Sequence, residues 1–225
     1  MNAEKQRTIL EFKKLLASVR SFFYGRIMNL LYDKFLDYKQ IANYRVEYEL
    51  DNGISLSVKL ELSAFPHLIG LHKLTDMPII RRFNDPNDKV VSAKYIIQKI
   101  KQQKILTDSS VRASQKFCDI EERYNNFSKE NLLSLSYTEA IVNFNPCKIG
   151  STLKSDFILF ERKDSGYNHL CIATAVPFVY TDCYPESFFY RPNDMYIANQ
   201  TIVKVREVRI YDQNNKIYLE DTLIK

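Results

Sequence analysis

Two alternating runs joined by one short turn are the feature that most constrains the fold. Apolar residues occupy every second position from Tyr44 to Leu50 and again from Ile54 to Leu62, and Asp51-Asn52-Gly53 stands between the runs. Strict alternation is typical of strands with one buried face, and Asn-Gly supplies the positive φ angles of a tight I′-type turn. The sequence therefore predicts an antiparallel β-hairpin, so this chain must build a sheet.

The segments around this hairpin predict helices before and after it, and strands at the end. Apolar residues recur at helical spacing from Ile9 to Phe35, which predicts a long amphipathic helix, or two helices broken near Gly25. The segment from Val90 to about Leu135 is also predicted to be mostly helical. After residue 137, six short strand-like runs alternate with turn residues: EAIVNF, DFILFE, HLCIAT, SFFYR, IVKVREVRIY and KIYLE.

This order predicts an α+β fold with helices packed on one face of a mostly antiparallel sheet and a long N-terminal helical extension. With no internal repeat and no Gly/Pro-rich linker, residues 1–225 are interpreted as one domain. The extension is assigned to residues 1–39 and the core to residues 44–225.

Composition is permissive about function. The 225 residues are 45% hydrophobic and carry a formal net charge of +5, which suits an anionic partner such as RNA or DNA without requiring one. The four cysteines are far apart and form no zinc motif, so reduced thiols in a cytoplasmic protein are expected. Neither a signal peptide nor a membrane span is expected. The oligomeric state is left open.

The segment FPHLIGLHKL, Phe65 to Leu74, places two of the three histidines five positions apart in an apolar run. It predicts a short helix, because Ser63 can cap it and Pro66 suits its first turn. On a helical wheel of about 100° per residue, His67 and His72 lie about 140° apart within the apolar arc. They are either interior histidines that bond backbone groups or an acid and a base. The i, i+5 spacing disfavours a metal site.

Two further clusters have side chains that suit a phosphate. The first surrounds Gly150 just before a strand and comprises Lys148, Ser151, Thr152 and Lys154. It lacks the spacing of a P-loop, which excludes that kind of nucleotide site. In the second, Ser187, Phe189 and Arg191 share one face of a predicted strand, where they suit a phosphate beside a stacked base. The ordinary alternatives are a polar strand entry and an edge strand with a core phenylalanine.

These pieces together resemble a known family. The hairpin leading into FPHLIGLHKL, followed by VNFNPCKIGSTLKSDFILFER, a short hydrophobic strand and YPESFFYRPNDMYIANQ, is similar to a phage-associated nuclease family of the barnase, EndoU, colicin and RelE class. The resemblance spans roughly Tyr44 to Gln200, and its most specific pieces are His-Leu-x-Gly-Leu-His and Pro-x-Ser-Phe-Phe.

The resemblance implies helices packed on a four-stranded antiparallel sheet, and RNA cleavage without a metal or other cofactor. It implies a catalytic set of His67, His72, Lys154 and Ser187. The substrate-binding set that goes with it is Lys73, Lys148, Thr152, Phe189 and Arg191. The chemistry agrees, because such cleavage needs a base for the 2′-hydroxyl, cations for the phosphorane oxygens and an acid for the leaving oxygen.

The resulting hypothesis is a metal-independent endoribonuclease, a toxin or effector of a phage or other mobile element. Its expected partners are RNA and an inhibitor or antitoxin protein, with no membrane. One alternative is a non-catalytic module that binds RNA or protein on the same fold. Another is a transferase acting on nucleotides, which would need a deep pocket with an acidic catalytic group.

Overall fold

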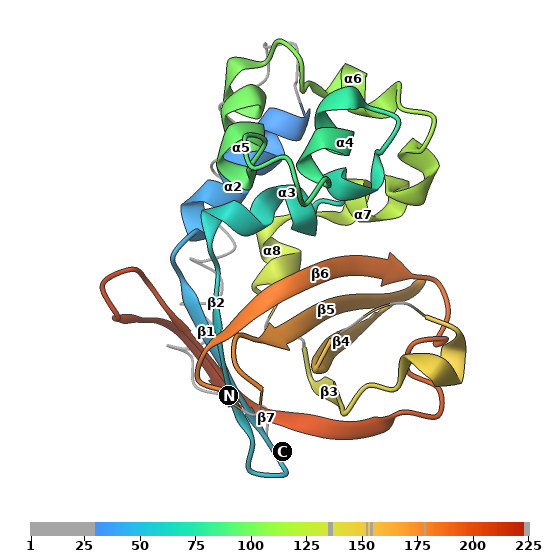
Figure 1. Ribbon diagram of the computed structural model, residues 1–225. Helices are drawn as coiled ribbons and strands as arrows, with labels where there is room; N and C mark the ends of the chain where they lie inside the picture. Colours follow the sequence, from blue (N-terminus) through green and yellow to red (C-terminus); the bar gives the residue numbers. More distant parts are fainter. Residues whose placement is uncertain (1–29, 135–136, 152, 154, 178, 223–225) are drawn as a thin grey trace.

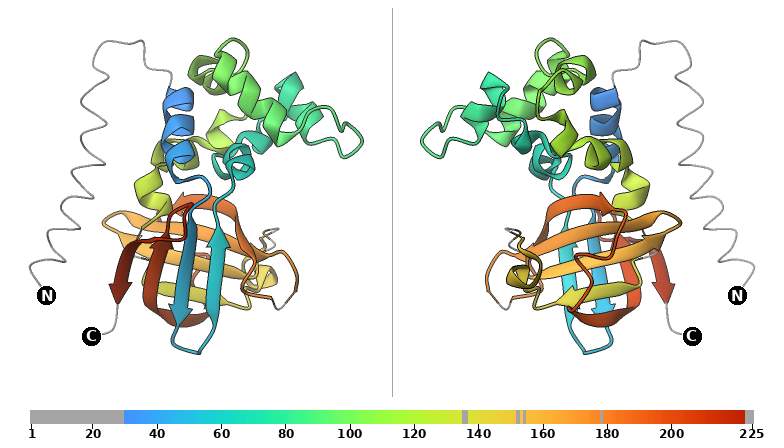
Figure 2. Two further views of the ribbon diagram at one scale, coloured as in Figure 1. Left: turned by 90° about the vertical axis from the view of Figure 1, so that its left-hand side faces the viewer. Right: turned by 90° about the vertical axis from the view of Figure 1, so that its right-hand side faces the viewer.

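The computed structural model describes residues 30–134, 137–151, 153, 155–177 and 179–222, and it places a helical layer at one end of a β-barrel. Figure 1 shows the helices above the strands, and the side views in Figure 2 show the same separation. The α+β class and the mostly antiparallel pairing are confirmed. The strands are β1 (Arg45–Leu50), β2 (Ser55–Lys59), β3 (Glu139–Val142), β4 (Phe157–Lys163), β5 (Gly166–Thr174), β6 (Cys183–Arg191), β7 (Thr201–Tyr211) and β8 (Ile217–Thr222).

The helices do not simply cover one face of the sheet, as predicted, because the sheet closes into a barrel and the helical layer lies at one end of it. The described strands follow the order β1-β2-β6-β5-β4-β3-β7-β8, and a further pairing of β1 with β7 completes a ring of seven strands. Strand β7 makes this possible through its 11 residues. It pairs with β3 through residues 201–204 and with β1 through residues 205–211. Only the β2–β6 pairing is parallel among the described strands.

The predicted hairpin is confirmed, but its turn is not of the I′ type. Strands β1 and β2 pair antiparallel, and the Leu50 amide donates to the Ile54 carbonyl at 2.8 Å. Only Gly53 in this turn is left-handed, with φ of +84°, whereas Asn52 keeps a negative φ. Asn52 instead accepts a hydrogen bond on its side-chain oxygen from the Ile54 amide at 3.1 Å. The connection is therefore a three-residue loop with glycine at its left-handed position.

The helical layer is made of short helices. They are α2 (Leu30–Ile41), α3 (Phe65–Leu68), α4 (Pro78–Phe83), α5 (Ala93–Gln102), α6 (Asp108–Arg112), α7 (Glu121–Asn126) and α8 (Lys129–Leu132), with 3₁₀ turns η2 (Leu62–Ala64), η3 (Leu71–Lys73), η4 (Phe117–Asp119) and, beside the barrel, η5 (Pro146–Ile149). The mostly helical segment after Val90 is confirmed. Most of the predicted N-terminal helix lies outside the described residues. No described helix is both long and apolar enough to cross a bilayer.

The main core joins the helical layer to the barrel. Phe127 is buried, and its ring contacts Tyr38 and Phe65 in the layer and Phe188 on β6. A second cluster lies on the opposite face of β3 to β6 and includes Ile158, Cys171 and Phe189. Ile149, Leu153, Tyr196 and Ile197 pack against it. Strand β6 therefore carries main-core residues on one face and this second cluster on the other.

Candidate active site

The two histidines of the FPHLIGLHKL segment form a stacked pair. Their ring centroids lie 3.8 Å apart, and the ring planes differ by 6°. The predicted single helix, with its imidazoles about 140° apart, is therefore wrong. Helix α3 covers only Phe65–Leu68, and a separate 3₁₀ turn, η3, carries His72. The predicted cap is also absent, because Ser63 makes no capping hydrogen bond and donates to Glu61.

Gly70 produces the break between the two histidines. Its φ of +92° is left-handed, and this reversal returns the chain so that His72 lies against His67. The position is also crowded, because a Cβ atom here would lie 2.9 Å from Cδ of Arg123 and 3.0 Å from Cγ2 of Ile120. Glycine is therefore required both for the backbone angle and for the close approach of α7.

Both imidazoles are held in the neutral form at pH 7. Burial is the main cause that lowers the pKa of His72 to about 3, and His67, Arg123 and Lys73 contribute to this shift. Burial is also the largest cause that lowers the pKa of His67, and the positive charges of Arg123 and Lys73 lower it as well. The His67 side chain remains exposed to solvent outside the stack, whereas Nδ1 of His72 is buried without a hydrogen-bond partner. A neutral, accessible imidazole can accept a proton.

Arg123 on α7 connects the histidine pair to strand β6. It influences both histidines, and it lies close enough to Arg191 for the two positive charges to interact. Burial lowers its pKa, and Nη1 has no hydrogen-bond partner. Among the described residues, Arg123 forms no ion pair. A partly buried guanidinium without a carboxylate is costly, and an anionic ligand would compensate that cost.

Arg191 supplies a second cation over an aromatic cluster. Its guanidinium carbon lies 5.6 Å from the ring centre of Phe189 and 5.9 Å from that of Tyr196, and Nη1 lies 3.6 Å from a carboxylate oxygen of Glu122. Nε is buried without a hydrogen-bond partner. The Phe189 ring itself is buried and stacks on His169, with centroids 4.7 Å apart. The face shared by Phe189 and Arg191 agrees with the predicted alternation of β6.

The remaining predicted site residues are distributed as follows. Ser187 is buried opposite Cys171, on the same face of β6 as Phe189. Lys148 lies in η5, and its ammonium donates to the Asn199 carbonyl at 2.6 Å. Thr152 and Lys154 lie outside the described residues. The roles of these side chains remain predictions.

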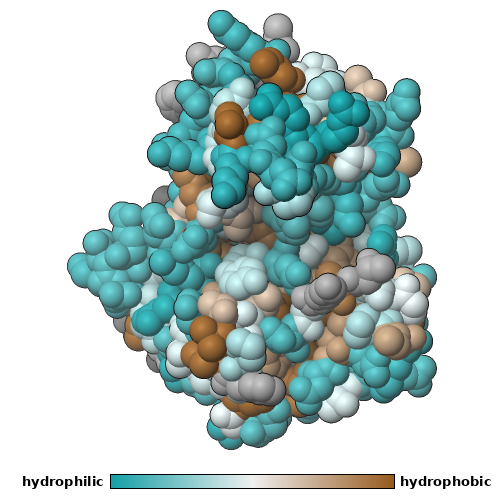
Figure 3. Space-filling model, in the orientation of Figure 1, coloured by the Kyte–Doolittle hydropathy of each residue, from teal (hydrophilic) through white to brown (hydrophobic). Residues whose placement is uncertain are grey.

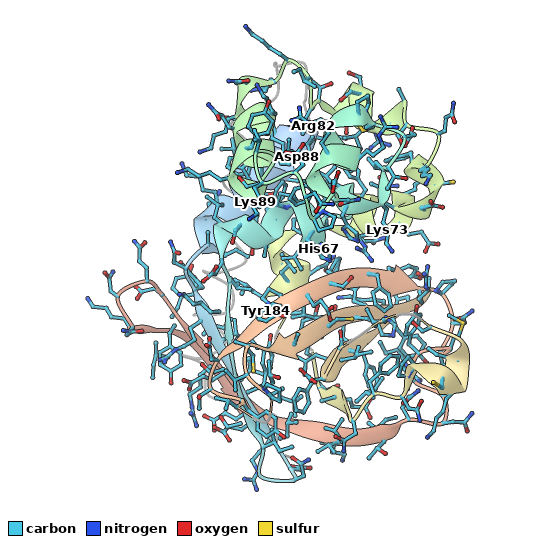
Figure 4. All side chains as sticks on the ribbon, viewed as in Figure 1. His67, Lys73, Arg82, Asp88, Lys89 and Tyr184 are labelled. Atoms are coloured by element: carbon cyan, nitrogen blue, oxygen red, sulfur yellow. The ribbon has the colours of Figure 1, made fainter. Side chains whose placement is uncertain are left out.

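Figure 4 places His67 where the helical layer faces the barrel, with Lys73 farther along the same layer and Tyr184 on the barrel side. Helices α3 and α7 both contact β6. The line along which these two helices meet β6 is called the seam. Lys73 is exposed beside the histidine pair. The structure thus brings His67, His72 and Lys73 together, and links them through Arg123 to Arg191. No three metal-ligating side chains gather within the described part of the chain.

Sequence reasoning missed Arg123, Glu122 and Tyr196. Arg123 lies in a helical segment with other charged residues, where a solvated face is the ordinary interpretation. Its one indirect signal is Gly70, because a glycine within an apolar helical pattern indicates a break or a close approach. Nothing local to Tyr196 relates it to Arg191, since that contact depends on how the chain returns after β6.

The comparison with known families agrees with this architecture. A closed α+β barrel with paired imidazoles and arginines at a seam provides base and cation chemistry suited to a phosphodiester. The chain belongs to the family described as phage-Barnase-EndoU-ColicinE5/D-RelE like nuclease 4, whose model matches residues 30–224. No curated protein and no solved structure matches the chain.

Proposed function

We propose that this nuclease is a metal-independent endoribonuclease whose active centre is the stacked His67–His72 pair with Arg123 and Arg191. The observation that supports this most directly is the position of Arg123. It is a partly buried cation without an ion-pair partner among the described residues, and it lies beside two neutral imidazoles. A phosphodiester would provide the missing negative charge next to a group that can accept a proton.

In the proposed reaction the exposed His67 imidazole accepts the proton of a 2′-hydroxyl. The 2′ oxygen attacks the adjacent phosphorus, and the bond from phosphorus to the 5′ oxygen breaks. Arg123 and Arg191 stabilise the negative charge on the phosphorane oxygens. The imidazolium formed in the first transfer then gives its proton to the leaving 5′ oxygen. The products are a 2′,3′-cyclic phosphate and a 5′-hydroxyl, and DNA is spared because it lacks the attacking group.

The other predicted residues have supporting roles in this proposal. His72 is a positioning residue, because its ring supports that of His67 through the stack. Lys154 and Ser187 are proposed as a further cation and hydroxyl at the scissile phosphate. Lys73, Lys148 and Thr152 are proposed to contact the substrate around it, and Phe189 is proposed to act on the substrate through the Arg191 guanidinium that lies over its ring.

The test is incubation of wild-type protein and the variants His67→Ala and His169→Ala with several classes of RNA in EDTA. His169 is the matched control, because it is the remaining histidine and lies buried in the second cluster. We expect new ends with 2′,3′-cyclic phosphate from wild type, lost with His67→Ala. The His169→Ala substitution can impair folding, so the folded fraction of each protein is measured by circular dichroism and each cleavage rate is divided by it. Metal-dependent cleavage, or 3′-hydroxyl ends, contradicts the proposed chemistry.

The second candidate is a non-catalytic module that binds RNA or protein. The burial of Nδ1 of His72 and its low pKa favour this reading, because they suit a packed histidine as well as a positioning one. Folded wild-type protein that binds RNA but produces no new ends would support the module. The third reading, a nucleotide transferase, has no comparable observation in its favour.

We also propose that the enzyme acts in the cytoplasm as a toxin or effector of a phage or mobile element, opposed by an inhibitor protein. The family description, which names phage nucleases, supports this. Induced expression in a bacterial host should arrest growth, and His67→Ala should relieve the arrest. Equal arrest by wild type and by this variant would contradict a toxic nuclease activity.

A further inference from the structure

Residues 73–104 in the helical layer are one of two basic stretches of the sequence, and the other, residues 1–29, lies outside the described residues. Residues 73–104 contain eight lysines and arginines and three aspartates, a formal excess of five positive charges that equals the net charge of the whole chain. These residues form α4, α5 and the turns beside them. Figure 3 shows the helical layer covered mainly by hydrophilic residues, whereas apolar residues are more frequent over the barrel. The layer therefore carries the surface best suited to a polyanion.

Helix α5 presents a lysine stripe on its exposed side. Ile96, Ile97 and Ile100 are buried against the core, whereas Lys94 and Lys101 are exposed, with the Lys101 ammonium 5.6 Å from the ring centre of Phe35. These two lysines are seven residues apart, which separates them by about 10 Å along the helix axis. Neither forms an ion pair among the described residues. Arg82, in contrast, pairs with Asp88 at 2.7 Å.

This basic segment begins at the candidate active site and lies in the same helical layer. Lys73 directly follows His72, helix α4 packs on η3, and α5 packs on α3. Figure 4 shows Arg82, Asp88 and Lys89 on the layer above His67 and Lys73. Residues 73–104 therefore start beside the histidine pair, and a polyanion bound to them lies on the layer that carries this pair.

The surface lacks the aromatic platforms of a single-strand binding site. Within residues 73–104, Val90 is the one exposed large apolar side chain. Tyr95 is partly buried, with the Lys99 ammonium 4.9 Å from its ring centre. Proteins that bind single strands interleave basic groups with aromatic rings, whereas duplex RNA is recognised mainly through its backbone and shape. The composition of this surface favours a duplex.

The barrel side of the seam, in contrast, presents an exposed aromatic ring. Tyr184 on β6 is 45% exposed, and in the view of Figure 4 it lies on the barrel, below His67 of the helical layer. It lies on the same face of β6 as Ser187, because it pairs with Ala173, two positions from the Cys171 that pairs with Ser187. An unpaired base can stack on an exposed aromatic ring of this kind.

We propose that residues 73–104 bind the phosphate backbone of a base-paired RNA segment, and that the unpaired nucleotides next to it enter the seam, where one base stacks on Tyr184. This inference rests on the proposed ribonuclease function and names its substrate class: RNA in which a stem adjoins a single-stranded cleavage position. The stem provides affinity through phosphate contacts, and the seam selects the unpaired segment.

The test measures binding separately from cleavage, with His67→Ala protein as the background. Four fluorescent probes are titrated at several salt concentrations: an RNA duplex with a single-stranded overhang, the same RNA without its complement, a DNA duplex with the same overhang, and a blunt RNA duplex. The double variant Lys94→Gln/Lys101→Gln is compared with Lys204→Gln/Lys216→Gln. The control removes the same charge from exposed barrel lysines, and glutamine has nearly the helix propensity of lysine.

We expect the RNA duplex with overhang to bind most tightly. The α5 double variant should reduce the slope of log K against log salt by about 1 to 2, because roughly two phosphate contacts are lost, and the barrel control should leave the slope unchanged. Tyr184→Ala should weaken binding of the overhang probe roughly tenfold and leave a blunt RNA duplex unaffected.

Equal effects of the two double variants, or tighter binding of the strand without its complement, overturn the duplex surface. Equal binding of the DNA duplex overturns the assignment to RNA. If no RNA binds, the proposed RNA surface is overturned, and an acidic protein becomes the candidate partner of residues 73–104. These outcomes are distinct from failure of the proposed function. If only the proposed ribonuclease function fails, the probes bind in the expected pattern but wild-type protein cleaves none of them.

Discussion

At the scale of single residues, the site contains buried polar atoms that have no hydrogen-bond partner among the described residues. Arg123 and Arg191 each have a buried guanidinium nitrogen without a hydrogen-bond partner, and Nδ1 of His72 is in the same condition. Native proteins satisfy most buried polar atoms, so three such atoms around one seam favour a bound ligand. Burial, and then the positive charges of Arg123 and Lys73, lower the pKa of His67, which is the proposed base.

This effect predicts the pH dependence of cleavage. The base must be neutral, and a pKa below 6.5 keeps His67 neutral as the pH falls below that value. In a pH profile of kcat/KM, the acidic limb should therefore have its midpoint below 6.5. Arg123→Gln should move this midpoint upward as well as lower the rate. A midpoint above 6.5 in wild-type protein would contradict the role assigned to His67.

His169 predicts a pH dependence of stability that is separate from activity. Burial lowers its pKa to about 3, so between pH 6.5 and about 3 the unfolded chain binds a proton that the folded chain excludes. The stability it contributes is present above 6.5 and is lost as the pH falls, at up to about 1.4 kcal/mol per pH unit. Denaturant unfolding of His169→Phe should show a shallower loss than wild type. Tyr167→Phe, in the same cluster, should retain the wild-type slope.

At the scale of elements, the break at Gly70 turns two separated histidines into a stacked pair. The sequence identified the apolar segment, its histidines and the adjacent hairpin correctly. It misplaced the imidazoles, because a helical wheel assumes one continuous helix. The signal was present in Gly70 itself, but the contact that requires glycine comes from Arg123 and Ile120 on a distant helix. Local pattern could not supply that contact.

Gly70→Ala tests this element. The left-handed backbone and the approach of Cβ to Arg123 should together lower the free energy of unfolding by about 2–4 kcal/mol, and the displaced stack should reduce cleavage. Gly53→Ala is the matched control, because Gly53 has a similar φ of +84° with no atom within 4 Å of an added Cβ. It should cost about 1–2 kcal/mol and leave cleavage unchanged. Equal losses in both variants would show that the crowding at Gly70 has no effect.

At the scale of the whole molecule, ring closure and the contact between layer and barrel determine where the seam lies. The six late strands were predictable from alternation and turn residues, and all six are present. Ring closure was not predictable from the sequence. The two halves of β7 form one continuous alternating pattern, although the first half pairs with β3 and the second half with β1. Barrels arise from such long-range pairing, which leaves no mark in local periodicity.

Phe127 is the residue that best tests the connection between layer and barrel. Phe127→Ala should lower the free energy of unfolding by about 3–5 kcal/mol, because it removes a buried ring that contacts both Phe65 and Phe188. Cleavage by the folded fraction should also fall, since the seam loses its support. Phe117→Ala removes a partly buried ring that packs on Tyr124 within the layer. Phe117→Ala should lower the free energy of unfolding by less than Phe127→Ala does and should leave cleavage unchanged. A larger loss of stability from Phe117→Ala than from Phe127→Ala would contradict the joining role of Phe127.

The most direct measurement of the central claim is single-turnover cleavage of one RNA oligonucleotide in EDTA, beside the same oligonucleotide with a 2′-deoxy nucleotide at the cleaved position. Wild-type protein should cleave the first to a 2′,3′-cyclic phosphate and leave the second intact. His67→Ala and Arg123→Gln should each slow the first reaction by a factor on the order of 10² or more. Cleavage of the 2′-deoxy oligonucleotide, or unchanged rates in both folded variants, would contradict a ribonuclease centre at the histidine pair.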